Sequence, residues 1–302
     1  MSERQSRLTG ALMVVVAAIA FSGKAIIIKL AYRHGVDAVT LLTLRMLFSA
    51  PLFVLVAWWA VRGPTVRPLS RADLRSIGIL GLIGYYLSSY LDFLGLQYIT
   101  AALERLILFL NPTFVLLFSA LLFKRRVTGR DIVALVLCYA GIGLVFGHDV
   151  TTQSGNVALG SFWVLLSALT YAAYLMGSGR LVGRVGSLRF ASYAGLVSCG
   201  GVIVQYVVTR DASVILSQPP QVYWLALLMA AVSTVLPIVL MSEGIRRIGA
   251  SHASIIGSVG PIATIFLGFF FLEEPITAFQ LGGAGLVLAG VLAISLQKKA
   301  GA

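Results

Sequence analysis

Two lysines stand inside an apolar stretch near the start of the chain, where the sequence reads FSGKAIIIKL from Phe21 to Leu30. A lysine at the centre of a bilayer costs about 2.5–3.5 kcal/mol on insertion scales, so it normally faces protein or water and has a partner. Each residue advances a helix by about 100°, which places Lys24 and Lys29 about 140° apart. We expect Lys24 to face a polar interior and Lys29 to reach the membrane edge with its long side chain.

Four further charged residues fall in later apolar stretches at a depth that matches Lys24. Arg45 lies early in the second stretch, Asp92 lies in the third, and Glu104 and Arg105 begin the fourth. Opposite charges at one depth neutralise one another, so we expect an outer charge cluster of Lys24, Arg45, Asp92, Glu104 and Arg105. The cluster forms either an extracellular gate or a site for the charged ends of a substrate. The alternative for Lys24 is a buried structural ion pair without substrate contact.

A second charge cluster is expected at the inner side, where Glu243, Arg246, Arg247 and His252 lie close together in the sequence. A cytoplasmic gate would lie at this depth. The alternative for His252, which stands among small residues, is a structural role.

One helical face in residues 157–179 combines aromatic rings with hydroxyl groups. Its residues recur at spacings of three and four, the spacing that brings side chains to one side of a helix; they are Trp163, Ser167, Thr170, Tyr171, Tyr174 and Ser178. Such a face can enclose an amphiphilic solute, whereas the alternative is ordinary packing with Trp163 at the membrane interface. The expected substrate pathway comprises Lys24, Tyr85, Ser89, Asn111, Trp163, Ser167, Tyr171, Tyr174 and Thr234.

The composition assigns these residues to a membrane protein. Of the 302 residues 59% are apolar and 11% charged, and the mean hydropathy is +0.95, whereas soluble proteins average roughly 25% charged residues. A crossing needs about 20 mainly apolar residues. Such windows lie at 8–30, 38–61, 74–97, 101–123, 131–147, 157–179, 189–208, 221–244, 250–272 and 277–296. We expect ten helices, although nine remain an alternative because the fifth window is short and Asp92 dilutes the third.

The net charge of +12 could suggest a nucleic-acid partner, but the distribution of the charge indicates topology instead. With ten helices, seventeen lysines and arginines fall on one side, and only Arg33 and Arg210 fall on the other. This positive-inside asymmetry predicts cytoplasmic termini and an external loop at residues 148–156. We expect the lipid bilayer and a small-molecule substrate as partners, with neither nucleic acid nor a required protein partner.

The chain lacks the residue patterns of common catalytic and metal-binding sites. The chain has three histidines, no HExxH motif and no paired carboxylates at helical spacing, so we expect no enzyme, no metal site and no cofactor. Cys138 and Cys199 have no paired spacing. We expect no cleavable signal peptide, because residues 8–30 exceed a typical signal-peptide core.

The sequence repeats itself with an offset of 149. Residues 95–141 align with residues 244–290 without a gap and share nine identities, including Pro112 with Pro261. An offset of 150 aligns Gly10 with Gly160 and places Lys24 on Tyr174. We expect two five-helix repeats, 1–150 and 151–302, that enter the membrane in opposite directions because five is odd. The paired prolines are expected hinges, and small-residue stripes such as Gly143 and Gly147 are expected packing surfaces.

These features resemble the EamA type of the drug/metabolite transporter superfamily. The resemblance rests on a lysine late in helix 1, on Arg45, on GLQYITAALERLILFLNP, and on GASHASIIGSVGPIATIFLGFFFLEEPITAFQLGGAGLVLAG. It implies an all-α fold of ten transmembrane helices, a five-plus-five inverted repeat around a central cavity, and export of small metabolites. Within the family, the chain most resembles bacterial amino-acid exporters, including aromatic amino-acid exporters. Lys124, Arg125 and Arg126 stand where many relatives have a glutamate, so we expect no substrate role for that loop.

The resulting hypothesis is a carrier that exports amino acids and related small amphiphilic metabolites across a bacterial inner membrane by alternating access. A channel, a multidrug permease of the same fold, a membrane enzyme and a non-transporting receptor are the alternatives. The energy source stays open, because Asp92, Glu104 or Glu243 could carry a proton and facilitated diffusion is equally compatible with the sequence.

Overall fold

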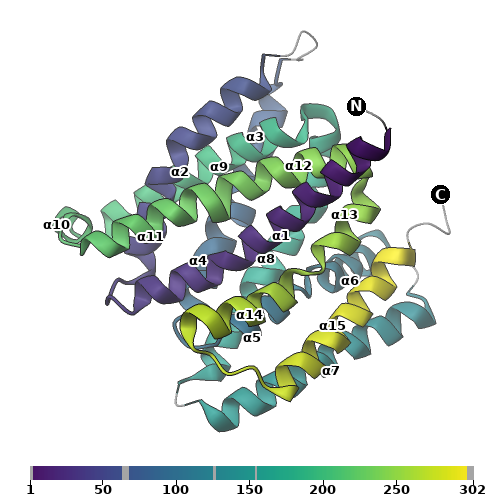
Figure 1. The fold of residues 1–302 in the computed structure, drawn as a ribbon. Helices are drawn as coiled ribbons and strands as arrows, with labels where there is room; N and C mark the ends of the chain where they lie inside the picture. The colour runs from purple at the N-terminus through teal and green to yellow at the C-terminus, as the bar shows by residue number, and fades with distance from the viewer. Residues whose placement is uncertain (1–2, 63–67, 125–126, 154, 298–302) are drawn as a thin grey trace.

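A computed structural model describes residues 3–62, 68–124, 127–153 and 155–297, and every regular element in these ranges is a helix (Figure 1). The first half contains α1 (Glu3–Tyr32), α2 (Ala38–Ala60), α3 (Arg71–Gly81), the π-helix η1 (Leu82–Leu87), α4 (Ser88–Gly95), α5 (Ala101–Leu108), α6 (Asn111–Phe123) and α7 (Gly129–Thr152). The second half contains α8 (Val157–Val185), α9 (Ser187–Thr209), α10 (Ala212–Leu216), α11 (Pro220–Ala230), the π-helix η2 (Ala231–Val235), α12 (Leu236–Ile248), α13 (Ala250–Gly257), α14 (Gly260–Leu272) and α15 (Ala278–Gln297).

The described helices make the chain an all-α, multi-pass membrane protein. Nine helical segments are long and apolar enough to cross a membrane, and Ala278–Ala293 is a shorter apolar segment. The prediction that the fifth span is the short one is wrong. A capping box of Thr128 and Asp131 starts α7, and this helix continues through residues 148–152, so the connection to α8 is limited to residues 153–156. Residue 154 lies outside the described residues, as do Arg67, Arg125, Arg126, Lys298 and Lys299 among the basic residues assigned to the inner side.

The helix boundaries confirm the five-plus-five repeat. With an offset of 149, the bounds of α2, α3, α5 and α6 become those of α9, α11, α13 and α14, and η1 falls on η2. Gly10 and Gly160 make equivalent contacts in α1 and α8. A Cβ on Gly10 would lie 2.8 Å from Cβ of Arg247, and one on Gly160 would lie 2.7 Å from Cβ of Tyr98. Because Arg247 and Tyr98 are themselves 149 residues apart, the equivalence of α1 and α8 extends to their neighbours.

The first helix of each half packs among the helices of the other half. α1 packs mainly against α12 and α14, and its counterpart α8 packs against α4, η1, α5 and α6 (Figure 1). The two sequence halves are therefore interlocked in space.

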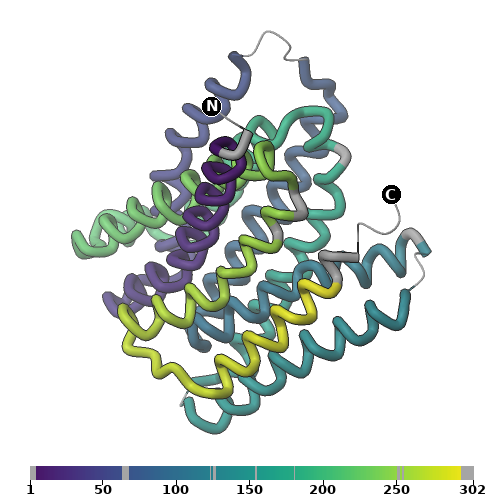
Figure 2. The backbone as a smooth tube through the Cα atoms, turned by 45° about the vertical axis from the view of Figure 1, so that its right-hand side comes forward, coloured from purple at the N-terminus to yellow at the C-terminus, as the bar shows by residue number. Residues whose placement is uncertain are grey.

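The last helix of each half, α7 and α15, pack against each other along one edge of the bundle (Figure 2). A Cβ on Gly141 would lie 2.9 Å from Val287, and one on Gly290 would lie 2.5 Å from Cys138. These contacts are reciprocal under the 149-residue offset, as a twofold relation requires. The expectation that Gly143 and its stripe form a packing surface is wrong, because a Cβ there would meet nothing within 4 Å.

Two of the spans are interrupted at equivalent places. Phe109 and Leu110 separate α5 from α6, and Ser258 and Val259 separate α13 from α14. Each break is followed by a proline in the first turn of the next helix, where the missing N–H group costs no hydrogen bond. The two breaks lie at the prolines that the sequence repeat pairs.

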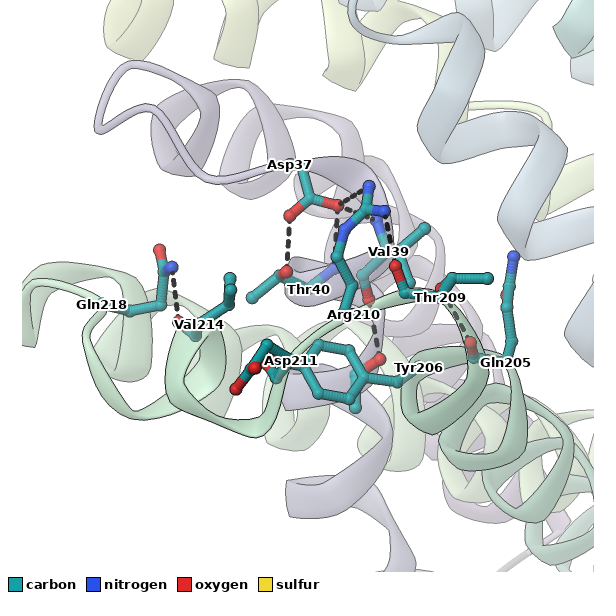
Figure 3. A network of polar contacts seen from close by, with 11 residues as sticks. Asp37, Val39, Thr40, Gln205, Tyr206, Thr209, Arg210, Asp211, Val214 and Gln218 are labelled. Atoms are coloured by element: carbon teal, nitrogen blue, oxygen red, sulfur yellow. Dashed lines mark hydrogen bonds and ion pairs between the residues drawn. The ribbon is translucent and has the colours of Figure 1, made fainter.

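A polar network ties α2 to α9 at the end of the bundle that includes residues 33–37 (Figure 3). Asp37 accepts hydrogen bonds from the backbone N–H and the hydroxyl of Thr40, and its Oδ1 lies 3.1 Å from Nη2 of Arg210. Burial of Asp37 raises the pKa of its carboxyl, but the hydrogen bonds from Thr40 and Arg210 outweigh burial, so the pKa lies below its usual value. The ionised carboxylate therefore stabilises this corner at neutral pH.

Candidate functional site

A central cavity of about 260 Å³ lies between the interlocked halves. Its lining comes from α1, α2, η1, α4, α5, α6, α8, η2 and α12, together with residues at the break between α5 and α6. The lining residues are Phe21, Lys24, Arg45, Gly84, Tyr85, Ser88, Ser89, Asp92, Arg105, Leu108, Phe109, Asn111, Ser167, Tyr171, Ser233, Thr234 and Ile238.

The cavity is lined by equivalent positions of the two halves. Several lining residues are repeat partners of one another: Phe21 with Tyr171, Gly84 with Ser233, Tyr85 with Thr234, and Ser89 with Ile238. A site that is lined by both copies at equivalent positions is the arrangement found where inverted repeats meet in secondary transporters.

Lys24 binds two carboxylates beside the cavity. Its Nζ lies 2.5 Å from Oδ2 of Asp92 and 3.2 Å from Oε1 of Glu104. The two acids are 3% and 0% exposed and Lys24 is 16% exposed, so this ion-pair cluster is withdrawn from water. The structure thus brings together three members of the expected outer cluster.

Lys29 has different partners near the end of α1. Its Nζ donates to the carbonyl oxygen of Ile99 at 2.7 Å and lies 3.2 Å from Oε1 of Glu274. At 25% exposure, Lys29 is outside the cavity lining, as the 140° rotation from Lys24 predicts.

Arg45 and Arg105 line the cavity without a carboxylate partner. Nε of Arg45 donates to Oγ1 of Thr234 at 3.0 Å, and its guanidinium lies 5.5 Å from the ring centre of Phe93. The guanidinium of Arg105 lies 5.5 Å from the ring centre of Phe109. Nη1 of Arg45 and Nε of Arg105 are buried and meet no hydrogen-bond acceptor, and no acid of the described residues lies within 4.0 Å of either guanidinium.

The two π-helices shape the middle of the cavity. η1 supplies Gly84 and Tyr85, and η2 supplies Ser233 and Thr234. Thr234 donates to the carbonyl oxygen of Met229 at 3.0 Å while it accepts from Arg45. Because π-turns commonly occur at functional sites, their presence at both repeat positions supports a role for the cavity.

The remaining pathway residues divide between the lining and a second layer. Tyr85, Ser89, Asn111, Ser167, Tyr171 and Thr234 line the cavity. Tyr174 is buried behind the lining, with its ring 5.3 Å from that of Tyr85 and 5.2 Å from that of Tyr171. Trp163 lies outside the lining and packs its ring against Phe162.

Sequence reasoning missed Gly84, Leu108, Phe109, Ser233 and Ile238 in the lining. The repeat offset could have found Ile238 from Ser89. Gly84 and Ser233 are repeat partners of each other, so the offset alone would not have found them. A Cβ at Gly84 would overlap the ring of Tyr174, which explains why this residue is a glycine. A single sequence contains no pattern from which this contact could be predicted.

The inner charge cluster is local to α12. Oε1 of Glu243 lies 2.6 Å from Nη2 of Arg246 and 2.7 Å from Nε of Arg247. Arg247 also packs against Gly10 of α1. His252, on α13, is exposed. No group of three potential metal ligands is found within the described ranges.

Comparisons with known proteins agree with this architecture. The sequence profile of the EamA-like transporter family matches residues 8–147 and 158–296. The chain is 32% identical over 305 residues to YcbK of Bacillus subtilis (strain 168), named an uncharacterized transporter, and the match covers 98% of this chain and 97% of YcbK. It is 23% identical to YicL of Salmonella typhimurium (strain LT2), named an uncharacterized inner membrane transporter, over 96% of both chains. One solved crystal structure superimposes with a TM-score of 0.63 over 95% of this chain and 96% of the other, at 14% identity, which shows a shared fold.

Proposed function

The chain belongs to the EamA-like transporter family and is a membrane transporter rather than an enzyme, and we propose that it exports amino acids and related small amphiphilic metabolites by alternating access. The observation that carries this proposal is the cavity that is lined by polar side chains from both halves. A solute held there is bounded by both repeats, so a rearrangement of one repeat against the other changes the side from which the solute is reached.

The unpaired polar atoms of the cavity suit an amino acid. Among the lining residues, the buried donors without an acceptor are Nη1 of Arg45 and Nε of Arg105, and the buried acceptors without a donor are Oδ1 of Asp92 and Oδ1 of Asn111. The buried hydroxyl of Ser233 also has no partner. An amino acid brings a carboxylate for the donors and an ammonium group for the acceptors. The rings of the lining, among them Tyr171, supply apolar surface for a side chain.

Alternating access needs gates and hinges, and the expected residues lie in suitable places. We assign hinges to the breaks before Pro112 and Pro261, because a broken helix can bend without losing regular hydrogen bonds there. The Glu243 cluster is the proposed inner gate. The repeats are assigned to residues 1–150 and 151–302.

The proposed location is a bacterial inner membrane with both termini in the cytoplasm. Support comes from the unequal numbers of lysine and arginine on the two sides of the membrane that the ten-helix topology predicts. It also comes from the relative YicL, which is named an uncharacterized inner membrane transporter.

Counterflow in liposomes tests the carrier. Purified protein is reconstituted into liposomes preloaded with an unlabelled amino acid, and entry of the labelled amino acid is followed with and without a pH gradient. A carrier gives transient accumulation of label above equilibrium, whereas a channel gives simple equilibration. Ser89→Trp fills the cavity and should abolish counterflow. Leu87→Trp is its matched control, because Leu87 lies two residues earlier, does not line the cavity and is exposed. Counterflow that is unaffected by Ser89→Trp would contradict transport through this cavity.

A further inference from the structure

We propose that the central cavity contains a carboxylate-binding subsite in which Arg45, together with Arg105, binds the anionic group of the substrate. The proposal rests on the carrier function above and specifies its substrate class. According to this proposal Lys24 does not bind the substrate, because its ammonium group is already paired with Asp92 and Glu104.

The charges around the cavity do not balance. Three cations, Lys24, Arg45 and Arg105, face two carboxylates, Asp92 and Glu104, and Lys24 lies within 3.2 Å of both acids. With every group ionised, the three cations and two carboxylates have a net charge of +1. This excess charge lies on the arginines, because both acids are paired with Lys24. An uncompensated buried charge is costly, so a single negative charge from a bound solute would complete the cluster.

Arg45 is held in one orientation by its neighbours, and its buried Nη1 has no acceptor. Its side chain is 6% exposed, its Nε is bound to Thr234, and its guanidinium lies over the Phe93 ring. These contacts leave Nη1 buried without an acceptor at a residue that lines the cavity. A guanidinium that is already positioned loses little side-chain freedom when it binds a carboxylate.

Arg105 supplies a second donor on the same cavity. A Cβ at residue 260 would lie 2.8 Å from Nη2 and 3.3 Å from Nε of Arg105, so Gly260 makes room for the guanidinium where α14 begins. Nε of Arg105 is buried without an acceptor. Hydrogen bonds between charged groups are about twice as strong as neutral ones, so each of the two arginines is a strong donor to a bound carboxylate.

Charge also selects among possible ligands. A phosphate ester carries about −1.5 to −2 at neutral pH, which would exceed the single unbalanced charge. A purely cationic solute would add to the excess positive charge. A carboxylate matches both the charge and the free donors.

Four probes that share a phenyl group test the subsite in the reconstituted protein. L-Phenylalanine and 3-phenylpropanoate carry a carboxylate, whereas L-phenylalaninamide and 2-phenylethylamine do not. We expect the first two to exchange at least about tenfold faster than the last two, as the loss of a charged hydrogen bond predicts. Phenyl phosphate should not compete. Arg45→Gln should raise the half-saturating concentration of 3-phenylpropanoate by about tenfold or more, with Arg45→Lys intermediate. Arg62→Gln is the control, because Arg62 is exposed and stacks on Trp58 outside the cavity.

The outcomes separate the two proposals. Equal exchange of the amine, the amide and the carboxylates would overturn the subsite and leave the carrier intact. If no probe and no amino acid is exchanged, the proposed function fails, and the subsite is then decided by the thermal unfolding of the ligand-free protein. Because Arg45 lacks an acid partner, Arg45→Gln should unfold at the parental temperature or above it. A decrease as large as that of Lys24→Met would show that Arg45 is neutralised within the fold, and would overturn the subsite even in the absence of transport.

Discussion

Replacing Lys24 by methionine removes the one cation that lies against both Asp92 and Glu104. Methionine keeps most of the apolar stem, so the substitution tests the charge rather than the packing. If the ion pairs stabilise the fold, Lys24→Met leaves two buried carboxylates without a counter-charge. The variant should therefore be much less stable than the parent protein.

The expected magnitude follows from the geometry of the cluster. At separations of 2.5 and 3.2 Å and an effective dielectric constant of about 20, each pair has a Coulomb attraction of about 5–7 kcal/mol. Desolvation costs several kcal/mol per ion and offsets most of this gain. Removing one partner of a buried pair nevertheless costs about 3–5 kcal/mol, because the remaining charge stays buried. Lys24→Met should fall in or above this range, since two acids are left.

Thermal unfolding of the purified protein, followed by intrinsic fluorescence, measures the loss. Adding Asp92→Asn should restore part of the stability, and adding Glu104→Gln as well should restore most of it, because no charge is then left unpaired. Lys29→Met is the matched control on the same helix. Lys29 is partly exposed, so its loss should cost about 0.2–1 kcal/mol. If Lys24→Met is as stable as the parent, the reasoning is refuted. If the triple variant regains stability but not transport, the charges of this cluster have a role in transport beyond stabilising the fold.

Three further predictions use other parts of the fold. Gly141→Ala should destabilise the protein by about 1–3 kcal/mol through overpacking, because the added Cβ would lie 2.6 Å from the carbonyl oxygen of Gly283. Gly143→Ala lies two residues further along the same helix and faces open space, so it should be neutral or slightly stabilising in the same unfolding assay. The pKa of Asp37 is lowered in the folded protein, so its contribution to stability is fully present above its unfolded pKa of about 3.9 and is lost as the pH falls through the folded pKa. Hydrogen exchange at the start of α2 should therefore become faster at this low pH. Arg210→Gln should weaken the pH dependence of the exchange rate. Reporters fused to either terminus should be cytoplasmic, and an insertion in residues 153–156 should be external; a cytoplasmic report from that insertion would contradict the assigned topology.

Hydropathy and repetition were sufficient to predict the fold. Helix positions follow from the number of apolar residues that a bilayer requires, and the offset of 149 already pairs Pro112 with Pro261 before the helix boundaries show it. The misjudged fifth span has a local cause. His148 and Asp149 lower the hydropathy at the end of α7, yet the helix continues to Thr152 because backbone hydrogen bonding does not depend on side-chain polarity.

The site was harder to predict, because periodicity gives an angle around a helix and not a depth along it. Ser167 and Tyr171 line the cavity, whereas Trp163 shares their face of α8 but lies beyond the cavity. The π-turn that presents Thr234 has no residue signature. Nη1 of Arg45 has no acceptor because Asp92 and Glu104 lie against Lys24 instead. Which cation the two acids bind is decided by the packing of α1, α4 and α5, which the sequence does not show.

The interlocking of the repeats places the Lys24 cluster between helices that pack against different partners. All the charged residues of the cavity come from the first half, and the positions equivalent to Lys24, Asp92 and Glu104 hold Tyr174, Met241 and Ala253. Yet α1, which carries Lys24, packs mainly against α12 and α14, while α4, which carries Asp92, packs against α8. The 2.5 Å ion pair therefore joins two packing groups rather than two neighbours within one group. If one group moves against the other, the distance between Lys24 and Asp92 must increase unless the Lys24 side chain follows Asp92. The alternating access proposed above must therefore either break this ion pair or reorient Lys24.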